Sequence, residues 1–426
     1  MENSSGRHSG RKLLVLTSTF PRWNGDNEPP FVYELSRRLQ KKFKIYVLAP
    51  HAAGCLSEEI LNGIYIKRFR YFFTRWEKLA YQGGILSNLK NYPVRYALVP
   101  FFLIAEYVVL VRMLRRHRFD LIHAHWIIPQ GLMALLARPF ARSKPALLCT
   151  SHGGDLYGLR GRFFAWLKSL VLNHTNTLTV VSRAMLENVL SMGGDSKKVS
   201  VIPMGVELQN RFIPPAARKE AQALLFVGRL VEKKGLRYLI EAMPEILGKN
   251  PSAFLRIAGD GPQREALEKR ISELKINERV QFLGPVCNDD LPSFYQTSNI
   301  VIFPSIVAAD GDREGFGLVL VEALGCECAL VVSDLPAMQD IIIDGKTALV
   351  IPQKDEKRLA DSVNELLDNS ALRTSLGQAG RQFALKHFDL DSIAEKYLEL
   401  IESTISSANS LSLGSGSGEG KRFNQF

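Results

Sequence analysis

Residues 223–247 read ALLFVGRLVEKKGLRYLIEAMPEIL, a short apolar run followed by a charged loop and a longer amphipathic stretch. The apolar run at 223–227 is typical of a strand covered on both faces, and 236–247 has the length and spacing of a helix. A strand followed by a helix is the repeating unit of parallel sheets with right-handed crossovers. This stretch therefore predicts an α/β fold.

The same unit recurs on both sides of residues 223–247. In the first half we predict strands at residues 12–18, 44–49, 65–69, 121–124, 146–150, 177–181 and 199–202. In the second half we predict further strands at 254–258, 280–283, 300–303, 329–333 and 348–351. Helix patterns separate most of them, among them 31–41, 263–274 and 317–324.

A chain of 426 residues is too long for one ordinary core and suits two domains. The polar stretch QNRFIPPAARK at 209–219 is a suitable linker, so we predict two Rossmann-like parallel-sheet domains that face each other across a cleft. The predicted parts are a first domain at 12–213, a second domain at 214–387, and a C-terminal helix at 388–405 that returns to the first domain. Residues 1–11 and the Ser- and Gly-rich residues 406–426 are predicted to be disordered.

The chain is basic, with a net charge of +11 from 54 Lys and Arg against 43 Asp and Glu. Residues 60–120 hold eleven Lys or Arg and three acids, so most of the excess lies in this segment. A basic surface indicates a phosphate-rich substrate, an acidic membrane or a nucleic acid. We expect no nucleic-acid partner, because the charge does not lie on a groove-fitting helix or a stacking sheet.

Five cysteines are spread along the chain without a CxxC pair: Cys55, Cys149, Cys287, Cys326 and Cys328. An odd and sparse set fits a reducing compartment and argues against a disulfide framework or a zinc knuckle. The polar residues 1–11 lack the apolar core of a secretory signal. We therefore expect a cytoplasmic protein.

Residues 97–114, ALVPFFLIAEYVVLVRML, are about as long as a minimal membrane span. Pro100, Glu106 and Arg112 interrupt the apolar run. We expect a packed or surface-lying helix here, with a true span as the alternative.

The strongest chemical signal is REGFGLVLVE at residues 313–322. Gly315 and Gly317 allow a tight turn at a helix start, whose free N–H groups and positive dipole can hold a diphosphate. Glu322 could accept hydrogen bonds from ribose hydroxyls, and Glu314 could meet the sugar. Alone, these acids would suit an exposed helix with solvated charges, so the context decides.

Basic residues follow the predicted strand at 223–227. Arg229 comes directly after Gly228, and Lys234 opens the helix pattern five residues later. Ligands of open α/β sheets bind at the carboxyl ends of the strands. Arg229 and Lys234 would lie there and offer a guanidinium fork and a point charge to two phosphates.

Together these motifs resemble the family-4 retaining glycosyltransferases of the GT-B fold. The resemblance is carried, in the family's order, by HAHW at 123–126 with Pro129 and Gly131, SHGGD at 151–155, VVS at 180–182, GR at 228–229 with KG at 234–235, GDGP at 259–262, and Glu314 through Glu322. It extends over about residues 13–388, which is nearly the whole chain expected to be ordered.

The resemblance implies a role for each matching position. Arg229 and Lys234 would bind the donor diphosphate and help the leaving group to depart. Glu314 would contact the transferred sugar, His152 would line the sugar pocket, and Glu322 would hold the ribose. Further donor-side positions are Gly228, Gly261, Gly315, Phe316, Gly317 and Leu318, and acceptor-side positions are Gly25, His125 and Asp155.

The resemblance also implies a mechanism without a metal or other cofactor, because two basic residues and a helix N-terminus would neutralise the leaving diphosphate. Transfer would retain the anomeric configuration by a front-face route, in which a donor phosphate oxygen assists the acceptor hydroxyl. No covalent nucleophile is then needed. Closing of the two domains would exclude water.

Some features depart from the family pattern or stay open. Family members usually carry adjacent glycines in the first turn, whereas TFPRWNGD at 19–26 holds only Gly25. Asp310 and Asp312 form a DxD-like pair, for which we expect a solvated loop rather than a metal site. His123 and His125 share one strand face without a third metal ligand nearby, so we expect structural or acceptor-side roles.

The expected partners are a nucleotide-diphosphate sugar and a glycan or lipid-linked acceptor. The basic and aromatic residues 67–76 have the composition of a membrane-surface patch, which suggests attachment to the acidic inner face of a membrane; simple solubilising charge is the alternative. We favour a uridine donor over a guanosine donor. A sugar-nucleotide epimerase of the same architecture and a non-catalytic scaffold are the competing functions.

Overall fold

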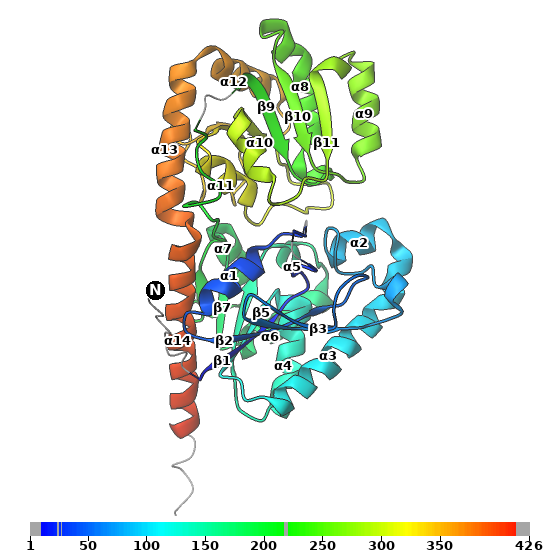
Figure 1. Cartoon of the computed structure of the whole chain (residues 1–426), viewed down its shortest axis with the longest axis vertical. Coiled ribbons are helices and arrows are strands. Elements are labelled where there is room, and N and C mark those ends of the chain that lie inside the picture. The colour runs from blue at the N-terminus through cyan, green and yellow to red at the C-terminus, as the bar shows by residue number, and fades with distance from the viewer. Residues whose placement is uncertain (1–9, 24, 27, 217–219, 415–426) are drawn as a thin grey trace, which may run out of the picture.

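The chain forms two parallel β-sheets, one in each half, which Figure 1 shows one above the other. The computed structural model describes residues 10–23, 25, 26, 28–216 and 220–414. Residues 1–9 and 415–426, both predicted to be disordered, lie outside the described residues. The predicted fold class, two Rossmann-like parallel-sheet domains, is confirmed.

The first sheet has eight strands in the order β3-β4-β2-β1-β5-β6-β7-β8. Their bounds are β1 Lys12–Leu16, β2 Lys44–Pro50, β3 Glu58–Leu61, β4 Ile64–Phe69, β5 Leu121–His125, β6 Ala146–Ser151, β7 Thr177–Val180 and β8 Val199–Val201. Neighbouring strands are parallel except for β3 and β4, which are antiparallel.

Helices cover both faces of this sheet, because alternate side chains of a strand point to opposite faces. Leu13 and Val15 of β1 pack with α1 (Phe31–Leu39) and α14 (Leu390–Gly414). Leu14 and Leu16 belong to the cluster on the other face, with α3 (Val99–Arg116), α4 (Leu132–Ala137) and α6 (Arg162–His174).

The second sheet has six strands in the order β11-β10-β9-β12-β13-β14. Their bounds are β9 Glu220–Val227, β10 Phe254–Ala258, β11 Val280–Gly284, β12 Ser298–Phe303, β13 Ala329–Ser333 and β14 Leu349–Ile351. One face packs against α8 (Leu236–Lys249), α9 (Arg264–Glu273) and α12 (Glu356–Asp368). The other packs against α10 (Leu291–Thr297), α11 (Leu318–Gly325) and α13 (Ser370–Phe388).

The structure adds the strand β3, which we did not predict. It joins β4 through a two-residue turn at Asn62 and Gly63, both with positive φ (48° and 82°). An Asn-Gly pair between strands is a strong hairpin signal. The strand itself reads EEIL, and it was not predicted because it lacks an apolar run.

The chain crosses between the domains twice at one place. The Val206 N–H donates to the carbonyl of Phe388 at 2.9 Å, and the Leu390 N–H donates to the carbonyl of Val206 at 3.0 Å. Beyond this crossing α14 packs on α1 and β6, while α13 packs on the second domain. Figure 1 shows the two helices following one another along the side of both domains.

Helix α14 runs to Gly414, which corrects the prediction that a disordered tail begins at residue 406. The hydroxyls of Ser406 and Ser410 donate to backbone carbonyls one turn earlier, those of Glu402 and Ser406. Ala408 also packs against the core that α14 shares with the first sheet. These contacts continue the helix through a Ser-rich segment that has little helix preference of its own.

Helix α3 corresponds to the long apolar segment. Among the described residues, one helical stretch, Pro93–Arg116, is long and apolar enough to cross a membrane. In the fold α3 packs against β2, β4 and α4 and buries one stripe of side chains, Phe102, Glu106, Leu110 and Leu114.

Candidate functional site

Loops at the carboxyl ends of the two sheets meet between the domains. Gly153 follows β6, and Gly315 precedes α11. A Cβ built on Gly153 would lie 2.8 Å from the Gly315 Cα, and one on Gly315 would lie 2.9 Å from the Gly153 Cα. Two glycines therefore allow a close backbone approach at the centre of the domain interface.

Arg229 reaches from the second domain into the first. Its Nη1 donates to the carbonyl of Gly83 at 2.9 Å, and its Nη2 donates to Ser87 Oγ on α2 (Ile85–Asn91). Burial lowers the pKa of Arg229, while the charge of Glu28 opposes this shift. The guanidinium thus lies between the domains with its charge only partly compensated.

Lys234 and Glu314 form an ion pair beside Arg229. The distance from Lys234 Nζ to Glu314 Oε1 is 3.3 Å, and Lys233 Nζ lies 3.9 Å from the same oxygen. Burial by itself would raise the pKa of Glu314, but the charges of Lys234 and Lys233 outweigh it and the pKa is lowered. The site therefore holds an ionised carboxylate among several cations.

Glu322 lies on α11 and accepts a hydrogen bond from Tyr295 OH at 2.8 Å. Burial raises the pKa of this carboxyl. We did not predict Tyr295, because it is far from Glu322 in sequence and shows no polar motif of its own. The structure thus supplies a fixed orientation for the carboxylate expected to hold a ribose.

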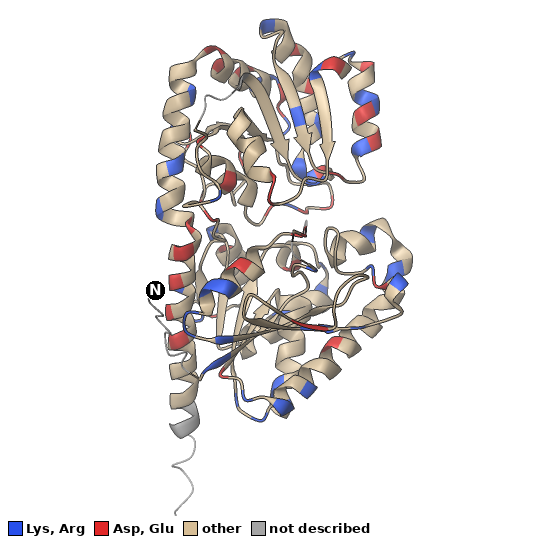
Figure 2. Ribbon diagram, viewed as in Figure 1, with Lys and Arg blue, Asp and Glu red and all other residues tan. Residues whose placement is uncertain are grey.

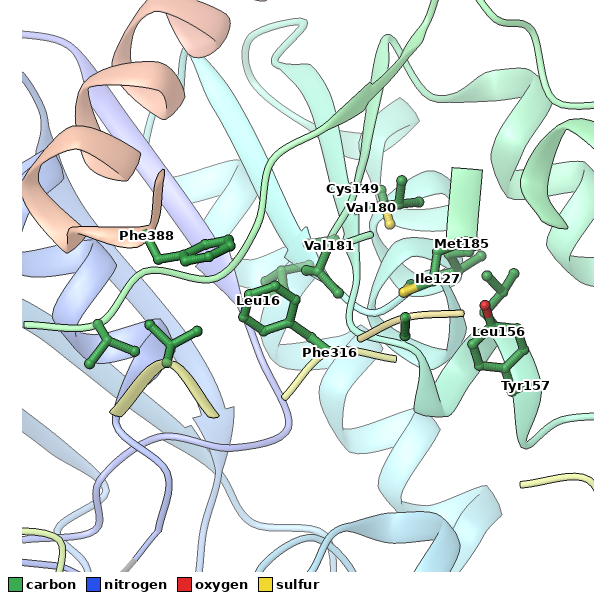
Figure 3. Close-up of a cluster of buried hydrophobic side chains, with 14 of the residues drawn as sticks. Leu16, Ile127, Cys149, Leu156, Tyr157, Val180, Val181, Met185, Phe316 and Phe388 are labelled. Carbon is green, nitrogen blue, oxygen red and sulfur yellow. The ribbon is translucent and has the colours of Figure 1, made fainter. Parts of the chain in front are cut away.

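The start of α11 is formed by Gly317 as the residue before the helix and Leu318 as its first residue. The side chain of Phe316 does not face outward: it packs in the apolar cluster of Figure 3, with its ring centroid 5.8 Å from that of Phe388. Leu16 and Met185 of the first domain belong to the same cluster. Only the backbone of Phe316 is therefore left for the donor role that we assigned to it.

Gly228 and Gly261 shape the loops around Arg229. A Cβ on Gly261 would come within 2.6 Å of the carbonyl oxygen of Leu230, and one on Gly228 would meet the Lys234 side chain at 3.4 Å. These glycines allow the loops after β9 and β10 to pack together. The two glycines therefore position the loops, and their predicted place on the donor side stays a prediction.

His152 lies in an aromatic enclosure at the end of β6. Its Nε2 is 2.9 Å from His125 Nδ1, and its ring centroid is 4.9 Å from that of Phe31 and 5.1 Å from that of Trp126. Burial lowers the pKa of His152 to about 3, and burial followed by the charge of His123 lowers that of His125. Both imidazoles are therefore neutral near pH 7.

His123 Nε2 lies 2.8 Å from Thr150 Oγ1, within the sheet, which agrees with a structural role. Asp155 is buried, and its carboxylate accepts hydrogen bonds from the Ile127 N–H at 2.6 Å and from Ser151 Oγ at 2.8 Å. Asp155 thus ties the turn after β5 to the end of β6. Both oxygens therefore have partners within the first domain, where they position these loops, and the acceptor-side role of Asp155 stays a prediction.

Gly25 lies where the first turn of the chain meets the second domain. Cys287 Sγ donates to its carbonyl at 3.3 Å, and Asn288 Nδ2 donates to the carbonyl of Glu28 at 2.8 Å. The carboxylate of Glu28 accepts from Gln82 N, close to the loop that binds Arg229. We predicted neither Glu28 nor Asn288, because such contacts depend on how the domains are placed.

Both carboxylates of the DxD-like pair interact with lysine side chains. Asp310 forms an ion pair with Lys90 of the first domain, and Asp312 Oδ1 lies 3.3 Å from Lys233 Nζ. Within the described part of the chain, no group of three or more His, Cys, Asp or Glu is placed to hold a metal ion.

A separate cavity of about 570 Å³ lies at the other end of the first sheet. Its lining comprises Phe119, Asp120, Arg138, Ser143, Lys144, Asn176, Ile405, Ala408 and Asn409. None of the predicted site residues is among these lining residues.

Comparisons with known proteins relate both halves of the chain to glycosyltransferases. Residues 30–210 match the family model Glycosyltransferase Family 4, and residues 209–383 match the model Glycosyl transferases group 1. A GDP-mannose-dependent alpha-(1-6)-phosphatidylinositol monomannoside mannosyltransferase of Mycolicibacterium smegmatis is 28% identical over 68% of this chain and 78% of its own. A glycogen synthase of Mycobacterium tuberculosis is 27% identical over 66% of this chain and 68% of its own.

Among solved structures, sucrose-phosphate synthase from Thermosynechococcus elongatus has a TM-score of 0.74 at 20% identity, covering 93% of this chain and 100% of its own. HepE from Anabaena, solved in complex with UDP-glucose, has a TM-score of 0.69 at 17% identity, covering 92% of this chain and 99% of its own. These likenesses show a shared two-domain fold.

Proposed function

The chain belongs to the family-4 glycosyltransferases of the GT-B fold, and we propose that it is a retaining hexosyltransferase that uses a nucleotide-diphosphate sugar. The observation that carries the proposal is the convergence of Arg229, Lys234 and the start of α11 around Glu314. Two cations and a helix N-terminus in a water-poor interface suit a leaving diphosphate.

The donor would lie along the second domain. Arg229 and Lys234 would bind the two phosphates, and Glu322, oriented by Tyr295, would accept from the ribose hydroxyls. Glu314 would exchange its ion pair with Lys234 for hydroxyls of the sugar. Arg229, Lys234 and Glu314 would then exchange intraprotein contacts for contacts with the donor, whereas Glu322 would keep its contact with Tyr295.

The acceptor would enter from the first domain, next to His152 and His125. Their neutral rings can donate to or accept from hydroxyl groups without adding charge. Retention would follow the front-face route, with the donor phosphate oxygen assisting the acceptor hydroxyl. The cations supply the charge neutralisation, so the proposed reaction requires no metal or cofactor.

We favour a uridine donor and keep guanosine as the second choice. The structural neighbour HepE was solved with UDP-glucose, whereas the mycobacterial relative is GDP-mannose-dependent. We further propose that the enzyme is cytoplasmic and acts at the inner face of a membrane on a glycan or lipid-linked acceptor.

A thermal-shift screen against UDP, GDP, ADP and their sugar conjugates tests the donor site. We expect one base to raise the melting midpoint of the wild type, because a ligand at a hundred times its Kd stabilises by about 2.7 kcal/mol. Lys234→Ala and Glu322→Ala should reduce the shift, and Lys269→Ala, on the exposed side of α9, should not. A wild type that no nucleotide shifts would contradict the proposal.

The stereochemistry and metal independence need a second measurement. Proton NMR of the sugar product should show the anomeric configuration of the donor, and EDTA should leave the rate unchanged. An inverted product or a rate abolished by EDTA would overturn that part of the mechanism while leaving the donor site intact.

A further inference from the structure

The surface charge of residues 70–174 is almost entirely positive. This segment contains fifteen Lys or Arg and four acids. Three of the acids, Glu77, Glu106 and Asp155, are buried, and the fourth, Asp120, accepts a hydrogen bond from the Lys12 N–H. This segment therefore offers cations to an anionic partner and contributes hardly any surface acids that would compete for them.

Helix α3, within this segment, buries an acidic side chain and exposes apolar ones, which is the reverse of the usual pattern for a surface helix. It buries Glu106 completely and exposes Phe101, Ile104 and Val108, at 50%, 62% and 37% of their surfaces. These three positions lie on one side of the helix, since they are separated by three and four residues. Water does not favour a surface of this kind, so it is typical of a helix that meets an apolar phase.

Aromatic side chains extend this stripe toward the domain interface. Phe72, Phe73 and Trp76 are exposed beside the start of α3, and the Phe72 ring centroid lies 5.3 Å from that of Phe101. We call Phe72, Phe73, Trp76, Phe101, Ile104 and Val108 the α3 face.

Basic residues border the α3 face. Arg75 lies within its aromatic end, and Arg112, Arg115 and Arg116 are exposed on the last turns of α3. Figure 2 shows Lys and Arg at both ends of this helix. Apolar side chains bordered by cations match the layered chemistry of an anionic bilayer, with acyl chains beneath phosphate head groups.

We propose that the α3 face is a docking surface that inserts into the head-group region of an anionic lipid bilayer. A second copy of the chain fits less well, because two such faces would bring their arginines together. A nucleic acid would pair with the arginines but offers no apolar phase to Ile104 and Val108. Helix α3 lies in the plane of the membrane in this arrangement, since its other side is part of the protein core.

The aromatic end of the α3 face adjoins the candidate active site. Arg95, between the two, donates to the Lys78 carbonyl at 2.9 Å and to Asn88 Oδ1 at 2.7 Å. Asn88 lies on α2, one residue from the Ser87 that binds Arg229. This inference rests on the proposed function. The continuity favours an acceptor that is itself held in the bilayer, because docking of the α3 face would bring the head group of such an acceptor to the cleft.

The test uses the full chain and vesicles of phosphatidylglycerol with phosphatidylcholine, against pure phosphatidylcholine, in a co-sedimentation assay. We expect binding to the anionic vesicles, at least tenfold weaker binding to the neutral ones, and a steep loss with salt. A triple variant, Phe101→Ser with Ile104→Ser and Val108→Ser, should reduce binding at least tenfold. The matched control, Leu56→Ser with Ile60→Ser, removes exposed apolar side chains elsewhere and should bind like the wild type.

A second variant, Arg112→Gln with Arg115→Gln and Arg116→Gln, keeps the test decisive if the serine variant does not fold, and it should lower the salt dependence of binding. Both variants should retain the nucleotide-induced thermal shift, so loss of membrane binding is distinguishable from loss of the donor site. No wild-type binding to anionic vesicles, or unchanged binding in the variants, would overturn the proposal. So would a wild-type dimer that the serine variant converts to a monomer, or tighter binding to RNA than to vesicles.

Discussion

Gly153 of the first domain and Gly315 of the second are in backbone contact, so close that a Cβ on Gly315 would lie 2.9 Å both from the Gly153 Cα and from the His152 carbonyl oxygen. The residues beside them, His152 and Glu314, are those expected to meet the transferred sugar. This contact between the domains therefore depends on the absence of two side chains.

A methyl group at position 315 should hold the domains apart. Gly315→Ala introduces no positive φ, so its effect comes from the contact with the backbone of residues 152 and 153. We expect a larger radius of gyration in small-angle scattering and at least a tenfold fall in kcat, because the reacting groups would no longer be aligned. Gly248→Ala, at a position with open space around it, is the control and should change neither quantity.

Arg229 should contribute mainly to departure of the leaving group. Removing a charged donor that stabilises developing charge in a water-poor site typically lowers kcat by about 10²–10³. We expect a loss of this order for Arg229→Ala and a much smaller one for Ser87→Ala, which removes only the contact of Arg229 with α2. The measurement is kcat with the identified donor, and equal losses in both variants would show that the interdomain contact matters more than the phosphate contact.

The hydroxyl of Tyr295 should tighten nucleotide binding through Glu322. Tyr295→Phe removes the donor that lies 2.8 Å from Glu322 Oε2 and leaves the carboxylate without this partner. A hydrogen bond to a charged group contributes about 1.5–3 kcal/mol, but the free carboxylate can find water, so we expect about a tenfold rise in Kd. Calorimetric titration of the wild type and the variant with the nucleotide measures this rise in Kd. An unchanged Kd would show that the ribose does not bind at Glu322.

Glu106 should make the protein less stable as the pH rises. Its burial raises the pKa of the carboxyl from 4.5 to about 8 in the folded chain. Below pH 4.5 both states hold the proton; between these two values only the folded state holds it, so the free energy of unfolding falls as pH rises, and above pH 8 it levels off.

Glu106→Gln keeps the shape and removes the titration. The variant should be more stable than the wild type at pH 7, by roughly 3 kcal/mol at most, and less dependent on pH. Urea denaturation between pH 5 and 8 measures both effects. Glu77→Gln is the contrasting control, because both oxygens of the buried Glu77 side chain have hydrogen-bond partners, His51 Nδ1 and the Tyr71 N–H, and replacing one oxygen should destabilise. Parallel pH profiles for the wild type and Glu106→Gln would exclude Glu106 as the cause.

The fold could be predicted from the sequence because buried parallel strands read as continuous apolar runs. Residues 223–227 and 254–258 are clear examples, and both belong to observed strands. Strand β3 escaped prediction since its four residues are partly charged and lie at the sheet edge. The exposure of apolar side chains on α3 could not be predicted either, because the sequence of an apolar segment does not show which of its sides faces the core.

The candidate site could be predicted only in part. Arg229, Lys234 and Glu314 come from loops next to strand ends of one domain, and the structure brings them together. Ser87, Asn288 and Tyr295 act through contacts that span domains or distant elements, and nothing in their local sequence marks them. The contacts of Asp155 could not be predicted either, because a carboxylate near a motif gives no sign of whether its oxygens already have partners.

Helix α14 has a consequence for how the protein is made. It covers one face of the first sheet together with α1, with Ile393, Tyr397 and Ile401 packed against the side that carries Leu13 and Val15. On the ribosome, these strand residues emerge well before α14, because the second domain lies between them in the sequence. Part of the core of the first domain therefore stays uncovered until the second domain has been synthesised and α14 has emerged to pack on the sheet.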